Sequence, residues 1–154
     1  MPAQLMKSVY LFKGMSDSTL NEIAKFCEPV NFDRETTLFT QGDKADALFL
    51  IKMGSAQITQ ETPNGDQLEV AVLGGGSHFG EMSFIDGENR SATVMVSKGS
   101  ELLKVPFREL QSYLDENPEE SVKFYREMLL FLCGRLRTTT QDLSFAKHEN
   151  IQFF

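Results

Sequence analysis

The chain has 154 residues, of which 41% are hydrophobic and 24% are charged, a composition typical of one globular domain. Its net charge of −7 argues against a nucleic-acid surface, because contacts to phosphate dominate such binding. No apolar run approaches the ~20 residues that a membrane span needs, and the first residues lack the layout of a signal peptide. We therefore expect a soluble, cytoplasmic protein that contacts neither a membrane nor DNA directly.

Residues 1–29 are expected to form an N-terminal helical segment. Its clearest helix covers residues 16–28, where Ser16 is a suitable N-cap and Pro29 is predicted to end the helix. Apolar residues recur there at helical spacing, namely Leu20, Ile23, Ala24 and Cys27. Cys27 and the second cysteine, Cys133, both lie in apolar helical settings, so we expect two buried thiols rather than a disulfide.

Residues 30–106 are predicted to be all-β. Turn-forming residues recur every ten to twelve positions, which is typical of a sandwich, jelly roll or barrel. They fall at Gly42-Asp43, Gly54-Ser55, Asn64-Gly65, Gly74-Gly75-Gly76, Asp86-Gly87 and Lys98-Gly99. Strand-like runs cover residues 47–51, 68–73, 92–96 and 102–105, and Asn64-Gly65 predicts a hairpin. Residues 81–86 lack strand alternation and are expected to form one short helical turn.

Residues 107–146 are predicted to form C-terminal helices, a short one over 107–116 and a longer one with Pro118 in its first turn. Apolar residues along the longer helix alternate by three and four, as in a coiled-coil seam. The seam consists of Val122, Tyr125, Leu129, Leu132, Leu136, Thr139, Leu143 and Ala146, and a second stripe consists of Phe124, Met128 and Phe131. Two apolar faces need two partners, so we expect a homodimer through residues 118–146. The alternative is that both stripes pack inside one chain.

Residues 147–154 are expected to form a tail. Its last five residues are mostly apolar and are candidates to pack on the β domain, seal a dimer or contact a partner.

The strongest functional signal is the cassette of residues 79–94. Gly80 and Glu81 lie ten and nine residues before Arg90, which is followed by the small residues Ser91, Ala92 and Thr93. A carboxylate accepts hydrogen bonds from hydroxyls, and an arginine fork grips phosphate oxygens with two parallel donors. Glycine allows close backbone approach, and the start of a short helix favours an anion. Singly, these residues are typical of turns and surfaces. Together they suit a small ligand with a sugar hydroxyl and one phosphate.

The motifs Phe79-Gly80-Glu81-Met82 and Arg90-Ser91-Ala92-Thr93-Val94 resemble the cassette of the cyclic-nucleotide-binding domains of catabolite-activator-type regulators, kinase regulatory subunits and gated channels. The similarity extends over about residues 10–143, including the turns at Gln41-Gly42-Asp43 and Met53-Gly54-Ser55. It implies a mainly β fold with flanking helices. The expected architecture is a double-stranded β-helix, or jelly-roll-like β-roll, with an N-terminal helical segment and a long C-terminal helix.

The resemblance also implies a ligand, cyclic AMP or cyclic GMP, and no cofactor. Glu81 would bind the ribose 2′-hydroxyl and Arg90 the cyclic phosphate. Gly80 and Ala92 would offer backbone donors and Ser91 a hydroxyl, with Met82 completing the motif.

The base would be recognised by the long helix, through Arg135 near the ligand and Thr139 and Thr140 facing the ring. Val70 and Val72, or Leu68 and Leu73, or a mixture of the two pairs, would form an apolar wall, since the strand register is open from sequence alone. Ser91, taken with the two threonines, favours cyclic AMP.

The expected function is a cyclic-nucleotide-binding regulatory domain without catalysis, in which the ligand shifts the long helix as a lid or dimer element. In the bacterial regulators a winged helix-turn-helix would begin near Phe154, so we expect the output in a separate partner protein or a fused domain. The alternative is an interaction module of the same fold that binds no nucleotide or another small anionic effector. A metal-dependent enzyme is disfavoured, because the only histidines, His78 and His148, are seventy residues apart.

Overall fold

The structure is a computed structural model that describes residues 2–152, with side chains to residue 148. Helices and strands follow in the order α1 (Pro2–Ser8), α2 (Asp17–Ala24), β1 (Glu28–Asn31), β2 (Thr36–Phe39), β3 (Ala47–Met53), β4 (Ala56–Glu61), β5 (Gln67–Leu73), β6 (His78–Phe79), α3 (Met82–Asp86), β7 (Thr93–Val96), β8 (Glu101–Pro106), α4 (Phe107–Glu116) and α5 (Pro118–Gln152). The predicted mainly β fold with flanking helices is confirmed.

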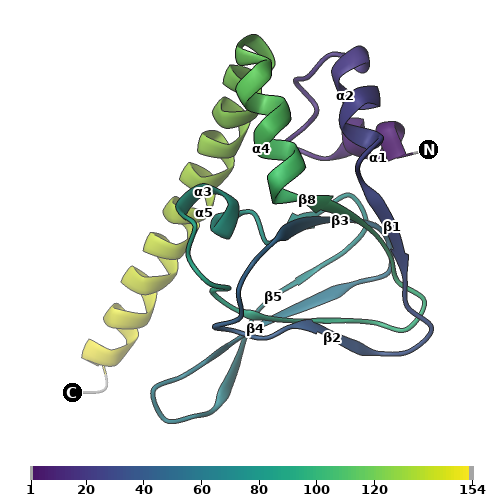
Figure 1. Cartoon of the computed structure of the whole chain (residues 1–154). Coiled ribbons are helices and arrows are strands. Elements are labelled where there is room, and N and C mark those ends of the chain that lie inside the picture. Colours follow the sequence, from purple (N-terminus) through teal and green to yellow (C-terminus); the bar gives the residue numbers. More distant parts are fainter. Residues whose placement is uncertain (1, 153–154) are drawn as a thin grey trace.

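Two four-stranded antiparallel sheets form the β-roll. One has the strand order β1-β8-β3-β6 and the other β2-β7-β4-β5. The sheets lie as two layers, with α1, α2 and α4 over the first and the β4–β5 hairpin at the edge of the second (Figure 1). The hairpin predicted at Asn64-Gly65 is confirmed, and Gly65 has the positive φ of 87° that its turn requires.

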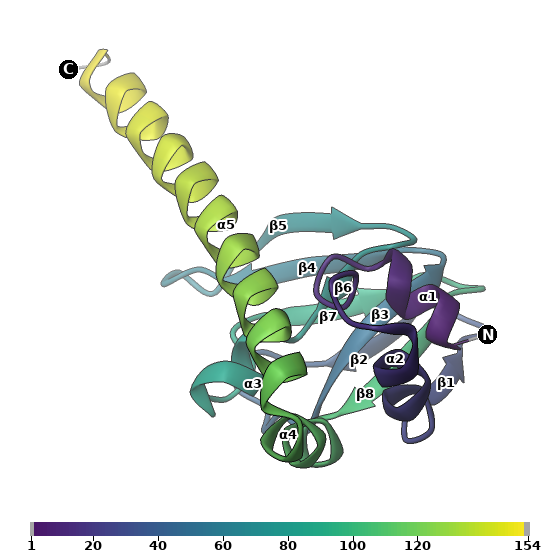
Figure 2. The same ribbon diagram turned by 90° about the horizontal axis from the view of Figure 1, so that it is seen from above.

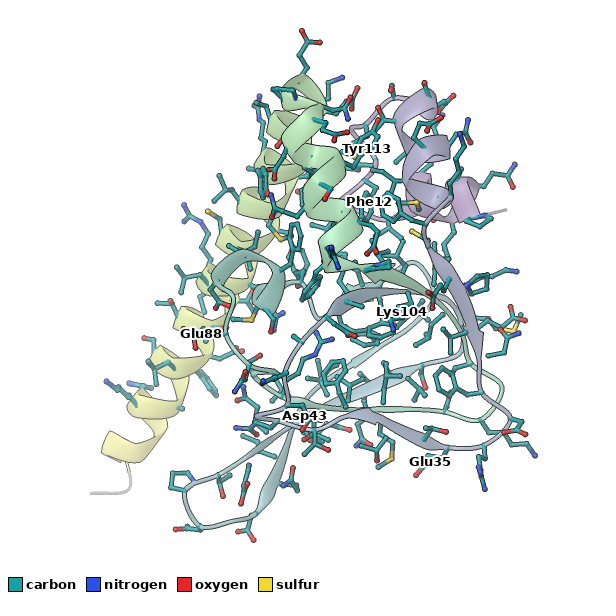
Figure 3. The ribbon with its side chains drawn as sticks, in the orientation of Figure 1. Phe12, Glu35, Asp43, Glu88, Lys104 and Tyr113 are labelled. Atoms are coloured by element: carbon teal, nitrogen blue, oxygen red, sulfur yellow. The ribbon has the colours of Figure 1, made fainter. Side chains whose placement is uncertain are left out.

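Strand β3 lies inside the first sheet, between β8 and β6, and both of its faces are buried. Leu48 and Leu50 belong to a core under the helices, whereas Phe49 and Ile51 belong to a second core between the sheets. This is why residues 47–51 read as a continuous apolar run rather than an alternating one. Figure 3 shows Phe12, a fully buried residue of the first core, between the helices and the sheet.

The N-terminal helix α2 is capped as predicted, since the Ser16 hydroxyl accepts a hydrogen bond from the backbone of Thr19 at 3.2 Å. The predicted helix over residues 16–28 is too long at its C-terminal end, and Pro29 does not end it. It ends at Ala24, and Pro29 lies within β1, which is an edge strand where a missing N–H is tolerated.

Helix α5 is 35 residues long and packs along one side of the roll before its C-terminal part projects beyond the sheets (Figure 2). No separate tail begins at residue 147, because the helix continues to Gln152. Phe153 and Phe154, at the end of the expected tail, lie outside the described residues. Within the described part of the chain, no helix is long and apolar enough to cross a membrane.

The two apolar faces of α5 differ in what covers them. Phe124 and Met128 of the second stripe are buried against the chain's own core. The seam is divided, because Tyr125 and Leu132 also pack on that core. The remaining large apolar seam residues are exposed and seven positions apart, namely Val122, Leu129, Leu136 and Leu143.

Candidate functional site

A cavity of about 740 Å³ lies between the β-roll and α5. Residues 79–83 and 90–92 line one side, strands β4 and β5 line another, and α5 contributes Phe131, Arg135 and Thr139. The short helical turn predicted in the cassette is confirmed as α3, which ends at Gly87 in the left-handed conformation. The fold thus brings the cassette and the long helix to the same space.

Arg90 is almost fully buried, with 5% of its surface exposed. Its Nη2 donates to the carbonyl of Ala47 at 2.6 Å and its Nη1 to the carbonyl of Gly80 at 3.2 Å, while the guanidinium lies 4.0 Å from the ring centre of Phe39. Burial lowers the pKa of the guanidinium, and the carboxylates of Asp46, Asp43 and Glu81 oppose that effect. These contacts hold the planar group in one orientation.

The nearby carboxylates do not pair directly with Arg90. Its Nε has no hydrogen-bond partner, and no carboxylate forms an ion pair with it among the residues that the structure describes. A buried cation without a paired anion is costly, and a guanidinium has five donors, of which two are used here. The arrangement is suited to receiving an anion from the cavity.

Gly80 makes room for this guanidinium. Its φ is 84°, and a methyl group at this position would lie 2.7 Å from Arg90 Nη1. A glycine is therefore required here both by the backbone conformation and by the close approach of Arg90.

Glu81 is buried as well, with 2% of its surface exposed. Its Oε1 lies 3.9 Å from Nη1 of Arg135, and its Oε2 lies 3.5 Å from Nδ1 of His78. Because Arg135 belongs to α5, this carboxylate connects the cassette to the long helix.

The remaining predicted residues divide into those that line the cavity and those that do not. Met82, Ser91, Ala92, Val70, Arg135 and Thr139 line it together with Gly80, Glu81 and Arg90, whereas Val72 and Thr140 do not. The Ser91 hydroxyl lies 3.8 Å from the sulfur of Met82, and the Ser91 carbonyl accepts a hydrogen bond from Gln60.

The apolar wall is a mixture of the two predicted pairs, and Val72 of the expected site residues does not belong to it. Val70 and Leu73 line the cavity, while Val72 and Leu68 are 59% and 58% exposed. The reason is a β-bulge. Ile58 pairs with Ala71 and Thr59 with Glu69, which leaves Val70 as the extra residue, so strand alternation does not continue through it.

Several lining residues were not predicted, namely Tyr10, Phe39, Ile58, Gln60, His78 and Phe131. His78 directly precedes the cassette, but a lone histidine has no sequence pattern that indicates a place in the cavity wall. Tyr10 and Phe131 meet across the fold, with ring centres 6.1 Å apart, and no local pattern connects positions so far apart in the sequence. Among the described residues, no group of three or more histidine, cysteine, aspartate or glutamate side chains is placed to hold a metal ion.

The sequence signature of the cyclic nucleotide-binding domain matches residues 29–117, more than half of the chain. The chain belongs to the cyclic nucleotide-binding domain family. It is similar to the CRP-like cAMP-activated global transcriptional regulator of Mycobacterium tuberculosis (strain ATCC 25618 / H37Rv), with 26% identity over 141 residues that cover 92% of this chain and 61% of the regulator. The chain thus spans about three fifths of that relative's length.

The chain is also similar to a solved structure and to one segment of a larger enzyme. The solved structure of a cyclic nucleotide-binding domain from Methylobacillus flagellatus KT matches with a TM-score of 0.79 and 26% identity, covering 92% of this chain and 79% of that one. Glutaminase 1 of Bradyrhizobium diazoefficiens is 29% identical over 126 residues, which are 82% of this chain and only 20% of the glutaminase. The chain is therefore a cyclic nucleotide-binding regulatory domain, and the jelly-roll-like class expected from the sequence is confirmed.

Proposed function

We propose that the domain binds one molecule of cyclic AMP in the cavity and acts as a regulator without catalysis. The observation that carries this proposal is Arg90, a buried guanidinium at the cavity wall that uses two of its five donors and has no carboxylate paired with it among the described residues. Its free Nη hydrogens would bind the cyclic phosphate, assisted by backbone donors of Gly80 and Ala92 and by the Ser91 hydroxyl. Glu81 would accept the hydrogen bond of the ribose 2′-hydroxyl.

The base would lie toward α5, between the apolar wall of Val70 and Leu73 and the side chains of Phe131 and Thr139, which all line the cavity. Ser91 and Thr139 favour the adenine nucleotide over the guanine nucleotide by the resemblance already described. Thr140, which does not line the cavity, would take part only if a second subunit or a movement of α5 brought it there.

Binding would be transmitted through α5. The Arg135–Glu81 contact couples the helix to the group that receives the ribose, so ligand arrival would change what α5 packs against. A ligand shifts such an equilibrium only if it binds one arrangement more tightly than the other. The exposed apolar stripe of α5 is the proposed homodimer seam through which the change reaches a cytoplasmic partner or a fused output domain.

Isothermal titration calorimetry with cyclic AMP, cyclic GMP and AMP tests the proposal. Arg90→Ala should weaken cyclic nucleotide binding by about tenfold to a hundredfold, because a charge-assisted hydrogen bond contributes about 1.5–3 kcal/mol. Arg34→Ala is the matched control, since Arg34 is exposed and does not line the cavity. If neither cyclic nucleotide binds the wild type at millimolar concentration, the proposal is wrong and an interaction module that binds no nucleotide takes its place.

A further inference from the structure

His78 is a buried polar residue that the proposed phosphate and ribose contacts do not use. It lies in β6, opposite Leu50 of β3, with 5% of its surface exposed. Neither Nδ1 nor Nε2 has a hydrogen-bond partner among the described residues. An imidazole contains at least one N–H donor, and leaving such groups unpaired in the interior costs free energy, so this position requires a physical reason.

The surroundings of His78 indicate through which group it acts. Its Nδ1 lies 3.5 Å from Oε2 of Glu81, and its ring lies 4.4 Å from that of Phe131 on α5. Both ring nitrogens are enclosed, so they do not face a ligand directly, although the side chain borders the cavity. The other charged or titratable groups here are Arg135, on the second oxygen of Glu81, and Arg90 and Tyr10 on the cavity wall.

We propose that His78 is a positioning residue for Glu81 that takes up a proton when cyclic nucleotide binds, so that affinity for the nucleotide rises as the pH falls from 8 to 6. This inference rests on the proposed function of the cavity. The proton comes from solvent and is held on the imidazole, whose Nδ1–H then donates a charge-assisted hydrogen bond to Glu81. The carboxylate held in this way accepts the hydrogen bond of the ribose hydroxyl with its remaining lone pairs.

The direction of the effect follows from the charges around His78. Before the ligand binds, Arg90 and Arg135 are two cations near the same space, and they oppose a third. The phosphate of the ligand neutralises Arg90, which removes one of the opposing charges and makes the contact between the imidazolium and Glu81 more favourable. The complex then holds more protons than its separate components. By linkage, affinity for the nucleotide then decreases as the pH rises.

The test is calorimetric titration with cyclic AMP at pH 6, 7 and 8. For the wild type we expect binding to be about three to ten times tighter at pH 6 than at pH 8, because an average uptake of about a quarter to a half of a proton over two pH units changes the affinity by that factor. His78→Gln keeps a hydrogen-bonding side chain but cannot take up a proton, so its affinity should be the same at both pH values. His78→Phe should also be independent of pH and should bind more weakly, since it cannot hold Glu81. His148→Gln removes the only other histidine, which does not line the cavity, and should follow the wild-type profile.

A measurement on the wild type alone tests the proposal even if a variant fails to fold. Titrations at pH 7 in buffers of different ionisation enthalpy count the protons taken up on binding, and we expect a positive fraction of one proton. Tight binding with no proton uptake and no pH dependence overturns the role of His78 and leaves the proposed function standing. A pH dependence that persists in His78→Gln also overturns it. Absence of cyclic nucleotide binding at every pH overturns the proposed function and this inference together.

Discussion

At the scale of single residues, Gly80 and Arg90 depend on one another. The positive φ of Gly80 turns its carbonyl toward Arg90, and the missing side chain leaves the space that the guanidinium occupies. Gly80→Ala should lower the free energy of unfolding by about 1–2 kcal/mol for the left-handed backbone and should also displace Arg90. We expect cyclic nucleotide affinity to fall about tenfold or more, because the displaced guanidinium loses its alignment with the phosphate.

Gly65→Ala is the matched control for this substitution. Its φ of 87° is close to that of Gly80, but it lies in the β4–β5 turn, where a methyl group meets nothing nearer than 4.0 Å. It should lose a similar amount of stability, measured by urea denaturation, and keep the wild-type affinity, measured by calorimetry. Equal affinities for the two alanine variants would mean that the position of Arg90 is not what Gly80 maintains.

The same residues show how far the site could be predicted. Gly80, Glu81 and Arg90 lie within one short segment, so their chemistry and spacing, placed between predicted strands, suit a ligand with a hydroxyl and a phosphate. Tyr10 and Phe131 could not be found in this way, because only the packing of α5 on the N-terminal segment brings them together. The choice among the alternatives for the wall of β5 could not be made from sequence, because the bulge at Val70 depends on pairing with β4, which strand periodicity does not contain.

At the scale of elements, the sequence predicts the existence and period of α5 well, but it does not show which of its apolar residues are covered by the chain itself. Its heptad spacing predicted a long helix with two apolar faces, but Tyr125 and Leu132 share the heptad while packing on their own domain. A heptad gives the period of a helix and not the identity of the partner on each face. The contacts of the folded chain are needed to separate the covered positions from the exposed stripe of Val122, Leu129, Leu136 and Leu143. Pro29 is a comparable case, because proline is compatible with an edge strand as well as with a helix end.

The exposed stripe makes a specific prediction about assembly. If α5 pairs with a second copy of itself, Leu136→Asp should raise the dimer dissociation constant at least about a hundredfold, because two leucines lose about 1.5–3 kcal/mol of burial each. Gln141→Asp is the control, since helical geometry places this exposed residue on a different face of α5. Sedimentation velocity should show a dimer for the wild type and Gln141→Asp and a monomer for Leu136→Asp. A wild type that is already monomeric at high concentration would remove the seam as an explanation of the stripe.

At the scale of the whole molecule, the two cysteines report on different parts of the fold. Both were predicted to be buried, but Cys133 is exposed on α5. Cys27 packs against the core that joins α1, α2, α4, α5 and the first sheet, and its thiol donates to the carbonyl of Ile23. Burial, with a smaller contribution from Glu28, raises the pKa of the Cys27 thiol to about 12. Since the thiolate is the reactive form, Cys27 becomes reactive when this core opens.

Thiol labelling therefore provides a test of ligand-linked stability. At pH 8 a disulfide reagent should label one thiol per native chain, Cys133, and both thiols in concentrated urea. The Cys133→Ser variant should show no labelling in the native state and one labelled thiol, Cys27, in urea. Cyclic AMP at a hundred times its dissociation constant should stabilise the native state by about 2.7 kcal/mol. For a urea m-value of about 1–3 kcal/mol/M, the midpoint at which Cys27 becomes reactive should rise by about 1–3 M, while AMP should leave it unchanged.

Rapid labelling of Cys27 in the absence of urea would contradict its burial. An unchanged midpoint would show that the nucleotide does not bind the native fold selectively, because only a ligand that prefers the folded cavity can hold the distant core closed.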